Sequence, residues 1–410
     1  MDPTPLRAPW ARPFHLMIKP IGSRCNLACR YCFYLEKEPV LYAGEGTKRM
    51  DDATLERLIR DYLASQPGDE VTFAWQGGEP TLMGIEFYRR VVALQKTYAA
   101  GRTIANALQT NGTLLDDEWG RFLAEEKFLV GLSLDGPKAL HDAYRVDRGG
   151  EPTWERVMRG LRVLKRHRVQ FNTLTVIHRR NVRHAHDVYS FLKEEGSGFL
   201  QFIPLVERRP SKAAAAAGWD HAAPAIDASE RVPAERVGEV VAEACAEPKR
   251  IGEFLTSVFD EWWRRDVGRV SVQLFEVTLA AWLGREGALC VFAERCGRAL
   301  AVEHNGDVFA CDHYVYPGYR WGNLNQKPVA DLGNSREAEH FGAGKADLPS
   351  ICRRCTYRFA CHGDCPKHRF VQPAPGEPGL SYLCPAYRHF FAHVRPAMEK
   401  MAASHRASPL

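Results

Sequence analysis

The chain has no stretch of about 18 consecutive apolar residues, the length that a membrane-spanning helix requires. It has no apolar signal segment at its start and no basic run interleaved with aromatic residues. Its 55 Lys and Arg residues are nearly balanced by 50 Asp and Glu residues, which leaves a net charge of +5. The sequence therefore predicts neither a membrane span nor a nucleic-acid surface. We expect a cytoplasmic protein, because thiols stay reduced in the cytoplasm.

Cysteine, in contrast, is plentiful and unevenly placed. Eleven of the 12 cysteines fall into an N-terminal triplet and a C-terminal group. A disulfide framework suits small secreted domains, whereas this chain has 410 residues and a 45% hydrophobic content that can fill large cores. Metal-bound thiolates are the better interpretation. The triplet is Cys25, Cys29 and Cys32, and the C-terminal group is Cys290, Cys296, Cys311, Cys352, Cys355, Cys361, Cys365 and Cys384.

Two kinds of metal centre accept thiolates in this pattern. Zinc could bind a four-sulfur site made of Cys352, Cys355, Cys361 and Cys365, and this group taken alone leaves zinc and iron-sulfur both open. An iron-sulfur cubane takes four thiolates, so a triplet leaves one iron open to a small molecule, while eight further cysteines can close two clusters. The remaining Cys245 lies in an apolar stretch that we predict to be helical, and we interpret it as a small core residue.

Apolar runs and amphipathic stretches alternate along the first half of the chain. Each predicted strand but the last is followed by a predicted helix. This pattern predicts a parallel sheet with helices outside it, either an open doubly wound sheet or a curved partial barrel. Strands are expected over 14–19, 71–75, 103–109, 128–134, 170–177 and 199–205, and helices over 52–65, 85–98, 116–126, 153–167 and 181–195.

The polar motifs of this half follow directly after predicted strands. The cysteine triplet follows the first strand, and Gly77-Gly78-Glu79-Pro80 follows the second. Residues 110–112, 133–136 and 204–207 follow the third, fourth and sixth strands. Reactive groups of parallel α/β folds lie at the carboxyl ends of strands, so we expect these loops to face one cleft.

The second half is less regular. Ala213 to Ala217, with prolines on either side, predicts a long loop, and helical segments are expected over about 237–283. Asn305-Gly306 lies between two short apolar runs and predicts a hairpin. That hairpin would place Cys311 and Asp312 at its end.

The stretch Cys25-Asn-Leu-Ala-Cys29-Arg-Tyr31-Cys32 resembles the signature of radical S-adenosylmethionine (SAM) enzymes, whose cysteines are separated by three and then two residues. Gly77-Gly78-Glu79-Pro80 resembles a second motif of that superfamily. The resemblance implies that SAM binds the open iron and is cleaved to a 5′-deoxyadenosyl radical. Gly77 and Gly78 would let the backbone approach the methionine part of SAM.

A narrower resemblance, to the anaerobic sulfatase-maturating enzymes, covers nearly the whole chain. It rests on Trp75 to Leu82, Gln109 to Gly112, Ser133 to Gly136, His141 to Arg145 and Gln201 to Glu207. It implies an α/β fold, a partial (β/α)6 TIM-like barrel of the radical SAM type, followed by a small cysteine-rich SPASM domain with two auxiliary clusters. Three [4Fe-4S] clusters are then expected. The implied auxiliary ligands are Cys290, Cys296, Cys311 and Cys365 for the first cluster and Cys352, Cys355, Cys361 and Cys384 for the second.

The same resemblance implies roles for single side chains. Asp312 falls on the position of a base that removes the proton from the substrate thiol or hydroxyl. By spacing alone, Asp312 could instead cap a turn. A guanidinium such as that of Arg145 suits a carboxylate, although most arginines are simply solvated. The implied SAM contacts are Tyr31, Gly78, Ser133, Arg145 and Leu205.

These features predict a radical SAM oxidoreductase that oxidises a cysteine or serine of an unfolded sulfatase to Cα-formylglycine. The expected domains are the barrel (1–235), a helical linker (236–286) and the SPASM domain (287–410). The expected partners are the sulfatase segment and an electron donor such as flavodoxin or ferredoxin, and the protein is expected to be a monomer. The alternatives are another SPASM-type peptide-modifying maturase, such as a thioether-forming enzyme, and a multi-cluster electron carrier without SAM chemistry.

Overall fold

The structure is a computed structural model that describes residues 13–44, 48–224, 228–285 and 289–407. Within these residues a ten-stranded sheet has the order β11-β10-β9-β1-β2-β3-β4-β5-β6-β8. Strands β1 to β6 pair in parallel and in chain order. A doubly wound sheet would reverse its order at a switch point, so the sequential order identifies the partial barrel. The barrel stays open because β9 pairs with β1 and β8 pairs with β6.

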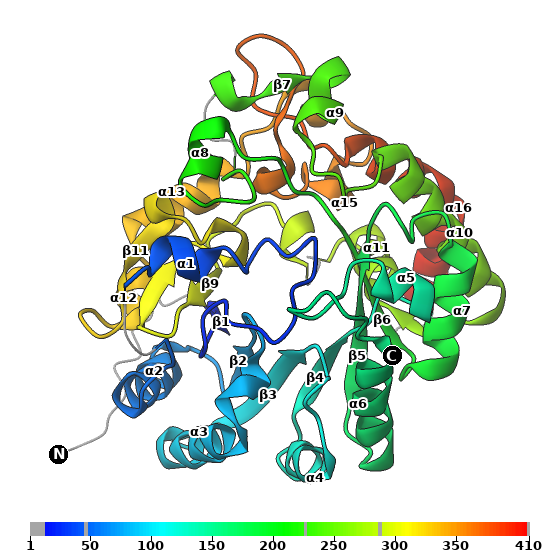
Figure 1. Cartoon of the computed structure of the whole chain (residues 1–410). Coiled ribbons are helices and arrows are strands. Elements are labelled where there is room, and N and C mark those ends of the chain that lie inside the picture. Colours follow the sequence, from blue (N-terminus) through cyan, green and yellow to red (C-terminus); the bar gives the residue numbers. More distant parts are fainter. Residues whose placement is uncertain (1–12, 45–47, 225–227, 286–288, 408–410) are drawn as a thin grey trace.

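The predicted strands of the barrel are confirmed. Leu16, Phe73 and Trp75 are fully buried, and the rings of Phe73 and Trp75 contact Tyr62 and Tyr88 of the helices outside the sheet. Burial of a strand face under a helix layer is the pattern that a parallel sheet requires. Figure 1 shows these strands as a fan with helices along its outer side. The strands are β1 (His15–Ile18), β2 (Glu70–Trp75), β3 (Thr103–Thr110), β4 (Leu129–Ser133), β5 (Phe171–Ile177) and β6 (Phe199–Pro204).

The predicted helices between these strands are also confirmed. Asp51 caps the first of them, because its carboxylate accepts a hydrogen bond of 2.7 Å from the backbone N–H of Thr54. The last begins at Ala185 rather than at residue 181, because the Asn181 side chain donates to the carbonyl of Val176 and holds a turn there. The helices are α2 (Asp52–Ser65), α3 (Ile85–Tyr98), α4 (Asp117–Glu125), α6 (Trp154–Arg166) and α7 (Ala185–Glu195).

Two predictions for the segment after β6 were wrong. Residues expected to form a long loop contain the short helix α8 (Lys212–Ala216), which Ser211 caps through a 3.1 Å bond from the N–H of Ala214. Alanine is the best helix former, so a run of alanines after a serine favours a helical turn. Cys245 was expected in a helix but lies between α9 (Val237–Val240) and α10 (Pro248–Arg265). It is 3% exposed, so its predicted burial is confirmed.

The predicted hairpin at Asn305-Gly306 is confirmed, and it joins the barrel sheet. Strand β9 (Ala299–Val302) runs parallel to β1, β10 (Asp307–Phe309) returns antiparallel to β9, and β11 (Arg320–Asn323) follows antiparallel to β10. Backbone hydrogen bonds therefore connect the cysteine-rich part to the first barrel strand. The predicted division between residues 286 and 287 lies outside the described residues, and the three-domain partition stays a prediction.

The C-terminal helix closes the molecule on the side of β6. Figure 1 shows α16 (Cys384–Ala407) beside α10, with α11 (Gln273–Trp282) to the left of both in this view. Phe390 stacks on Phe275 of α11 with 5.8 Å between ring centroids. No helix in the described ranges is long and apolar enough for a membrane crossing. The remaining elements are α1 (Lys37–Leu41), α5 (Lys138–Asp142), α12 (Val329–Gly333), α13 (Arg336–Gly344), α14 (Ser350–Arg353), α15 (Arg358–Cys361), β7 (Val232–Pro233), β8 (Ser271–Val272) and β12 (Val371–Gln372).

Candidate active site

The N-terminal cysteine triplet lies on the loop that follows β1, as predicted. Burial, followed by the charges of Glu79, Cys29 and Cys32, raises the pKa of the Cys25 thiol to about 12. This mutual influence requires the three thiols to lie near one another. The Cys25 Sγ accepts a 3.3 Å bond from the N–H of Leu27. Three clustered soft donors suit an iron-sulfur cluster with one open iron, and the ligand role of each cysteine stays a prediction.

Gly77 and Gly78 pack directly against the cysteine loop. A Cβ on Gly78 would lie 2.0 Å from the carbonyl oxygen of Arg24, a distance that real atoms do not reach. Gly77 has a φ of 131°, a value that side chains disfavour. The N–H of Gly78 donates to the carbonyl of Gly22 at 2.8 Å. The two glycines therefore let the loop after β2 pack closely against the backbone of the cysteine loop. Their contact with SAM stays a prediction.

Glu79 connects the loops after β2 and β3. It is 1% exposed, and its Oε1 accepts bonds from the hydroxyls of Thr81 and Thr110 at 2.6 and 2.7 Å. Its Oε2 accepts a 2.8 Å bond from the N–H of Asn111. Burial raises the pKa of Glu79, and these hydrogen bonds oppose the rise. The carboxyl thus fixes the geometry of two loops that line the predicted cleft.

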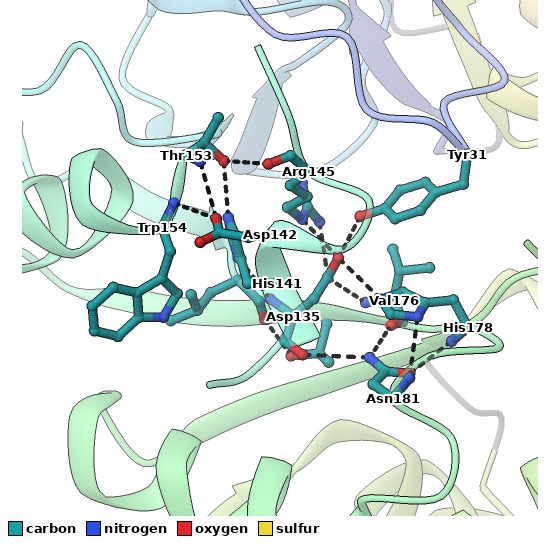
Figure 2. A network of polar contacts seen from close by, with 12 residues as sticks. Tyr31, Asp135, His141, Asp142, Arg145, Thr153, Trp154, Val176, His178 and Asn181 are labelled. Atoms are coloured by element: carbon teal, nitrogen blue, oxygen red, sulfur yellow. Dashed lines mark hydrogen bonds and ion pairs between the residues drawn. The ribbon is translucent and has the colours of Figure 1, made fainter. Parts of the chain in front are cut away.

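A buried network centred on Asp135 links the ends of β4 and β5 (Figure 2). Arg145 binds Asp135 through two parallel contacts, Nε to Oδ2 at 2.9 Å and Nη2 to Oδ1 at 3.1 Å. The Tyr31 hydroxyl donates to Asp135 Oδ2 at 2.6 Å, and the N–H of Val176 donates to Oδ1 at 3.0 Å. Burial favours the protonated carboxyl, but Arg145 and His178 hold the pKa of Asp135 well below its usual range.

This network changes the interpretation of Arg145. The side chain is not a solvated surface arginine, because the residue is 7% exposed. Its Nε and Nη2 are already engaged by a carboxylate of the chain itself. Sequence reasoning missed Asp135 and His178 as partners of Arg145 and Tyr31. The only signal was that Asp135 lies in the Ser133-Leu-Asp-Gly136 motif at a strand end.

The other predicted SAM contacts lie at neighbouring strand ends. Ser133 is the last residue of β4 and is 8% exposed. Leu205 follows β6, is 7% exposed, and donates its N–H to the carbonyl of Ile177 at 3.0 Å. The structure brings Tyr31, Arg145 and the cysteine triplet together. Their proximity is evident at Cys29, because the charge of Arg145 lowers the pKa of its thiol and that of Asp135 raises it. Their contacts with SAM stay predictions.

Asp312 lies at the end of the hairpin and contacts the barrel. Its carboxylate forms an ion pair with the ammonium of Lys19, which directly follows β1. The Lys19 side chain is 3% exposed and that of Asp312 is 23% exposed. Lys19 also lies 4.4 Å from the ring centroid of Tyr34, whose hydroxyl donates to the buried Glu303. Burial raises the pKa of Asp312, but Lys19 and His313 outweigh it and lower the pKa below the usual value.

The eight C-terminal cysteines separate into two groups that interleave along the chain. Burial raises the pKa of Cys311, and Cys365, Cys296 and Cys290 raise it further, so these four thiols lie together. The other four, Cys352, Cys355, Cys361 and Cys384, line one cavity of about 300 Å³. The members of each group are those of the two ligand sets that the family resemblance implied, and their ligand roles stay predictions. It separates Cys365 from the three cysteines with which it would have formed a zinc site.

Sequence reasoning missed a further buried pair near both cysteine regions. Glu207, after β6, forms an ion pair with Lys367, and both side chains are less than a tenth exposed. The charge of Glu207 also acts on the pKa of the Cys32 thiol, which burial raises. No spacing along the chain signals a pair between residues 160 positions apart.

Comparisons with known proteins decide the family. The model of the Radical SAM superfamily matches residues 20–192, and SPASM, an iron-sulfur cluster-binding domain, matches residues 290–356. A serine-type anaerobic sulfatase-maturating enzyme of Bacteroides thetaiotaomicron is 42% identical over 395 residues, which cover 96% of this chain and 92% of the relative. The chain belongs to the anaerobic sulfatase-maturating enzymes.

Other anaerobic sulfatase-maturating enzymes are also similar. A cysteine-type enzyme of Clostridium perfringens is 32% identical over 400 residues, which cover 95% of this chain and 98% of the relative. A solved structure of native anSMEcpe with bound AdoMet and Cp18Cys peptide matches with a TM-score of 0.81 and 31% identity, covering 96% of this chain and all of that one. Membership confirms the predicted fold class and cofactors, which are SAM, its [4Fe-4S] cluster and the auxiliary clusters.

Proposed function

We propose that this chain oxidises a serine side chain in an unfolded sulfatase segment to Cα-formylglycine. Family membership supports the reaction. The choice of serine is supported by identity, because the serine-type relative is 42% identical and the cysteine-type relative 32% identical over similar lengths. When bound, SAM and the clusters would supply the radical that takes hydrogen from the β-carbon and would accept the electron that the substrate loses.

The observation that carries this proposal is the position of Asp312. Removal of hydrogen from a carbon that bears a hydroxyl gives an aldehyde only if the hydroxyl proton also leaves. The Asp312 carboxylate is the group that we assign to accept this proton. Lys19 holds it at the carboxyl end of β1, where the loop that carries the cysteine triplet begins. A base next to the predicted radical site is what the reaction needs.

The remaining residues would bind and orient the cofactors. Cys25, Cys29 and Cys32 would hold the SAM-binding cluster, and the two interleaved sets of four cysteines would hold the auxiliary clusters. Gly77, Gly78 and Glu79 would keep the cysteine loop in place. Asp135 and Arg145 would position Tyr31, which lies one residue before Cys32. Each of these roles is a proposal.

A direct assay tests the reaction and the choice of substrate together. The anaerobically reconstituted protein would be incubated with SAM, dithionite and matched peptides that differ only by serine or cysteine at the target position. We expect the aldehyde product, one 5′-deoxyadenosine for each aldehyde, and faster conversion of the serine peptide. A faster cysteine reaction would reverse the substrate preference. The absence of aldehyde with either peptide would refute the proposed function.

Two alternatives give different outcomes in the same assay. A thioether-forming maturase would produce a cross-linked peptide instead of an aldehyde. A multi-cluster electron carrier would produce no 5′-deoxyadenosine. Cys29→Ala, which removes one ligand of the open cluster, should abolish 5′-deoxyadenosine production and so provides the control for SAM chemistry.

The partners and location complete the proposal. A one-electron donor such as flavodoxin or ferredoxin would reduce the SAM-binding cluster, and the protein would act as a monomer. A cytoplasmic location would keep the eleven proposed ligand cysteines reduced and available for clusters, and none of them forms a disulfide in the structure. Size-exclusion chromatography of the reconstituted protein tests whether it is a monomer.

A further inference from the structure

Besides Lys367, which pairs with Glu207, two further cationic side chains are buried inside the cysteine-rich part of the chain. Lys345, which follows α13, is 0% exposed, and Arg369 is 6% exposed. The ammonium of Lys345 donates to the carbonyls of Cys290 and Val291. The guanidinium of Arg369 donates to the carbonyls of Gly363, Lys345, Asp347, His362 and Asp364.

Neither cation has a carboxylate partner among the described residues. All hydrogen bonds recorded for the two side chains go to backbone carbonyls, and no ion pair within 4.0 Å involves either of them in those parts of the chain. A buried charge without a counter-charge is strongly unfavourable. Backbone carbonyls satisfy the donors but do not neutralise the charge. A compensating anion is therefore expected at this position.

The groups that face these cations are thiols of the two cysteine sets. Burial raises the pKa of Cys290 and of Cys296, and the charge of Lys345 opposes the rise in both. Burial also raises the pKa of Cys352, and the charge of Arg369 opposes the rise at both Cys296 and Cys352. Lys345 thus lies near the first set, and Arg369 lies between the first set and the second.

We propose that Lys345 and Arg369 are permanent counter-charges for the two auxiliary clusters. The inference rests on the proposed function, which assigns those clusters to the eight cysteines. A thiolate-bound cubane carries a net negative charge, because its thiolates and sulfides outweigh its irons, and the charge and hydrogen bonds around it set its reduction potential. The two residues are positioning residues. They stabilise the reduced, more negative state of a cluster and so raise its potential as an electron acceptor.

The buried carboxylate of Asp364, whose charge acts on both cysteine sets, does not replace the clusters as counter-charge. Asp364 is fully buried, and its Oδ2 accepts bonds from Ser381 at 2.7 Å and from His368 at 2.8 Å. A single carboxylate can balance only one of the two cations. Asp364 also raises the pKa of Cys361 and Cys365, after burial, so it adds negative charge to both sets.

The test uses full-length protein with Cys25, Cys29 and Cys32 replaced by alanine, so that only the auxiliary clusters remain. Lys345→Met removes the charge at nearly constant volume, and Lys345→Arg keeps it. Lys327→Met removes an exposed charge from the same part of the chain and is the matched control. Two readouts are compared: the midpoint potentials from a redox titration followed by electron paramagnetic resonance, and the unfolding temperatures of loaded and metal-free protein.

We expect Lys345→Met to shift one auxiliary potential to more negative values and to leave the other nearly unchanged, whereas Lys345→Arg and Lys327→Met leave both in place. We also expect Lys345→Met to reduce the difference in unfolding temperature between loaded and metal-free protein. A lysine that only satisfies carbonyls would lower both temperatures equally, and that result with unchanged potentials would overturn this inference alone. Zinc in place of iron in the parent protein would overturn the cluster assignment as well.

Discussion

Lys19 and Asp312 form an ion pair across 293 residues of sequence. Lys19 directly follows the first barrel strand, and Asp312 directly follows Cys311 at the end of the hairpin strand β10. The pair exists because β9 adds to the sheet beside β1, with Ile18 opposite Val302. The sheet extension therefore places the predicted base of the reaction next to the loop that carries the cysteine triplet.

Replacing Asp312 by asparagine should separate SAM cleavage from peptide oxidation. The amide keeps the shape of the side chain but cannot accept the hydroxyl proton, and loss of a general base typically costs about 10²–10⁴-fold in rate. We expect aldehyde formation to fall by about that factor while 5′-deoxyadenosine is still released. The measurement is the ratio of aldehyde to 5′-deoxyadenosine. Asp331→Asn, at an exposed site on α12, is the control, and an unchanged ratio in Asp312→Asn would remove the base role.

Replacing Gly78 by alanine should displace the cysteine loop. The added methyl group would lie 2.0 Å from the Arg24 carbonyl oxygen, so the backbone must move. We expect loss of the SAM-binding cluster, roughly one third of the iron, with retention of the auxiliary clusters. Iron content and 5′-deoxyadenosine production measure the effect. Gly238→Ala, where no atom lies within 4 Å of the new methyl, should load normally, and full iron content in Gly78→Ala would contradict the packing argument.

Breaking the pair between Asp135 and Arg145 should destabilise the barrel strongly. Arg145→Met leaves the fully buried Asp135 carboxylate without its cation, and removal of one partner of a buried pair costs about 3–5 kcal/mol. The double variant Asp135→Asn/Arg145→Met carries neither charge and should recover a large part of that loss. Chemical denaturation of metal-free protein at neutral pH gives both free energies of unfolding. Equal losses in the single and double variants would show that the charges do not carry the effect.

Lys37 should make stability depend on alkaline pH. The residue is 1% exposed, and its ammonium lies 3.5 Å from the Tyr316 ring centroid. Burial lowers the pKa of Lys37 to about 8, against the opposing charge of Glu36. An unfolded lysine has a pKa of about 10.4. Between these values the unfolded chain binds a proton that the folded chain does not, so the free energy of unfolding should rise with pH by at most about 1.4 kcal/mol per pH unit.

The measurement compares this chain with Lys37→Met from pH 7 to pH 10, so that other titrating groups cancel. The difference in unfolding free energy should be flat below about pH 8 and should then change in favour of the lysine form as pH rises. Lys212→Met, at an exposed position, should give no such trend. A difference that stays constant across the whole range would show that Lys37 keeps an ordinary pKa in the folded protein.

Local sequence patterns were sufficient to predict the strands and helices of the barrel. The predicted strands and helices of the first half correspond to β1 to β6 and to the helices between them, because hydrophobic period and capping residues act over a few neighbours. The exceptions have local causes too. The Asn181 side chain holds a turn, so α7 begins later than predicted. The alanine run after Ser211 forms α8 where we expected a loop.

Long-range pairing decided what the sequence could not. No spacing indicates that Arg145 holds Asp135, that Lys367 holds Glu207, or that the hairpin joins the barrel at β1. The family resemblance implied two interleaved ligand sets, and the structure places the thiols of each set together, whereas proximity along the chain would have grouped Cys365 with its sequence neighbours. The ligand roles stay predictions.

The amino-acid sequence by itself determined the chemistry that this protein can perform: the order and spacing of its thiols, the glycine motif, the acid after Cys311 and the strand-helix alternation are local properties of the chain. Only the tertiary structure decided which of these groups meet. Contacts such as the one between Lys19 and Asp312 depend on sheet order and on the burial of charges in pairs, and both arise when distant segments pack together and exclude water.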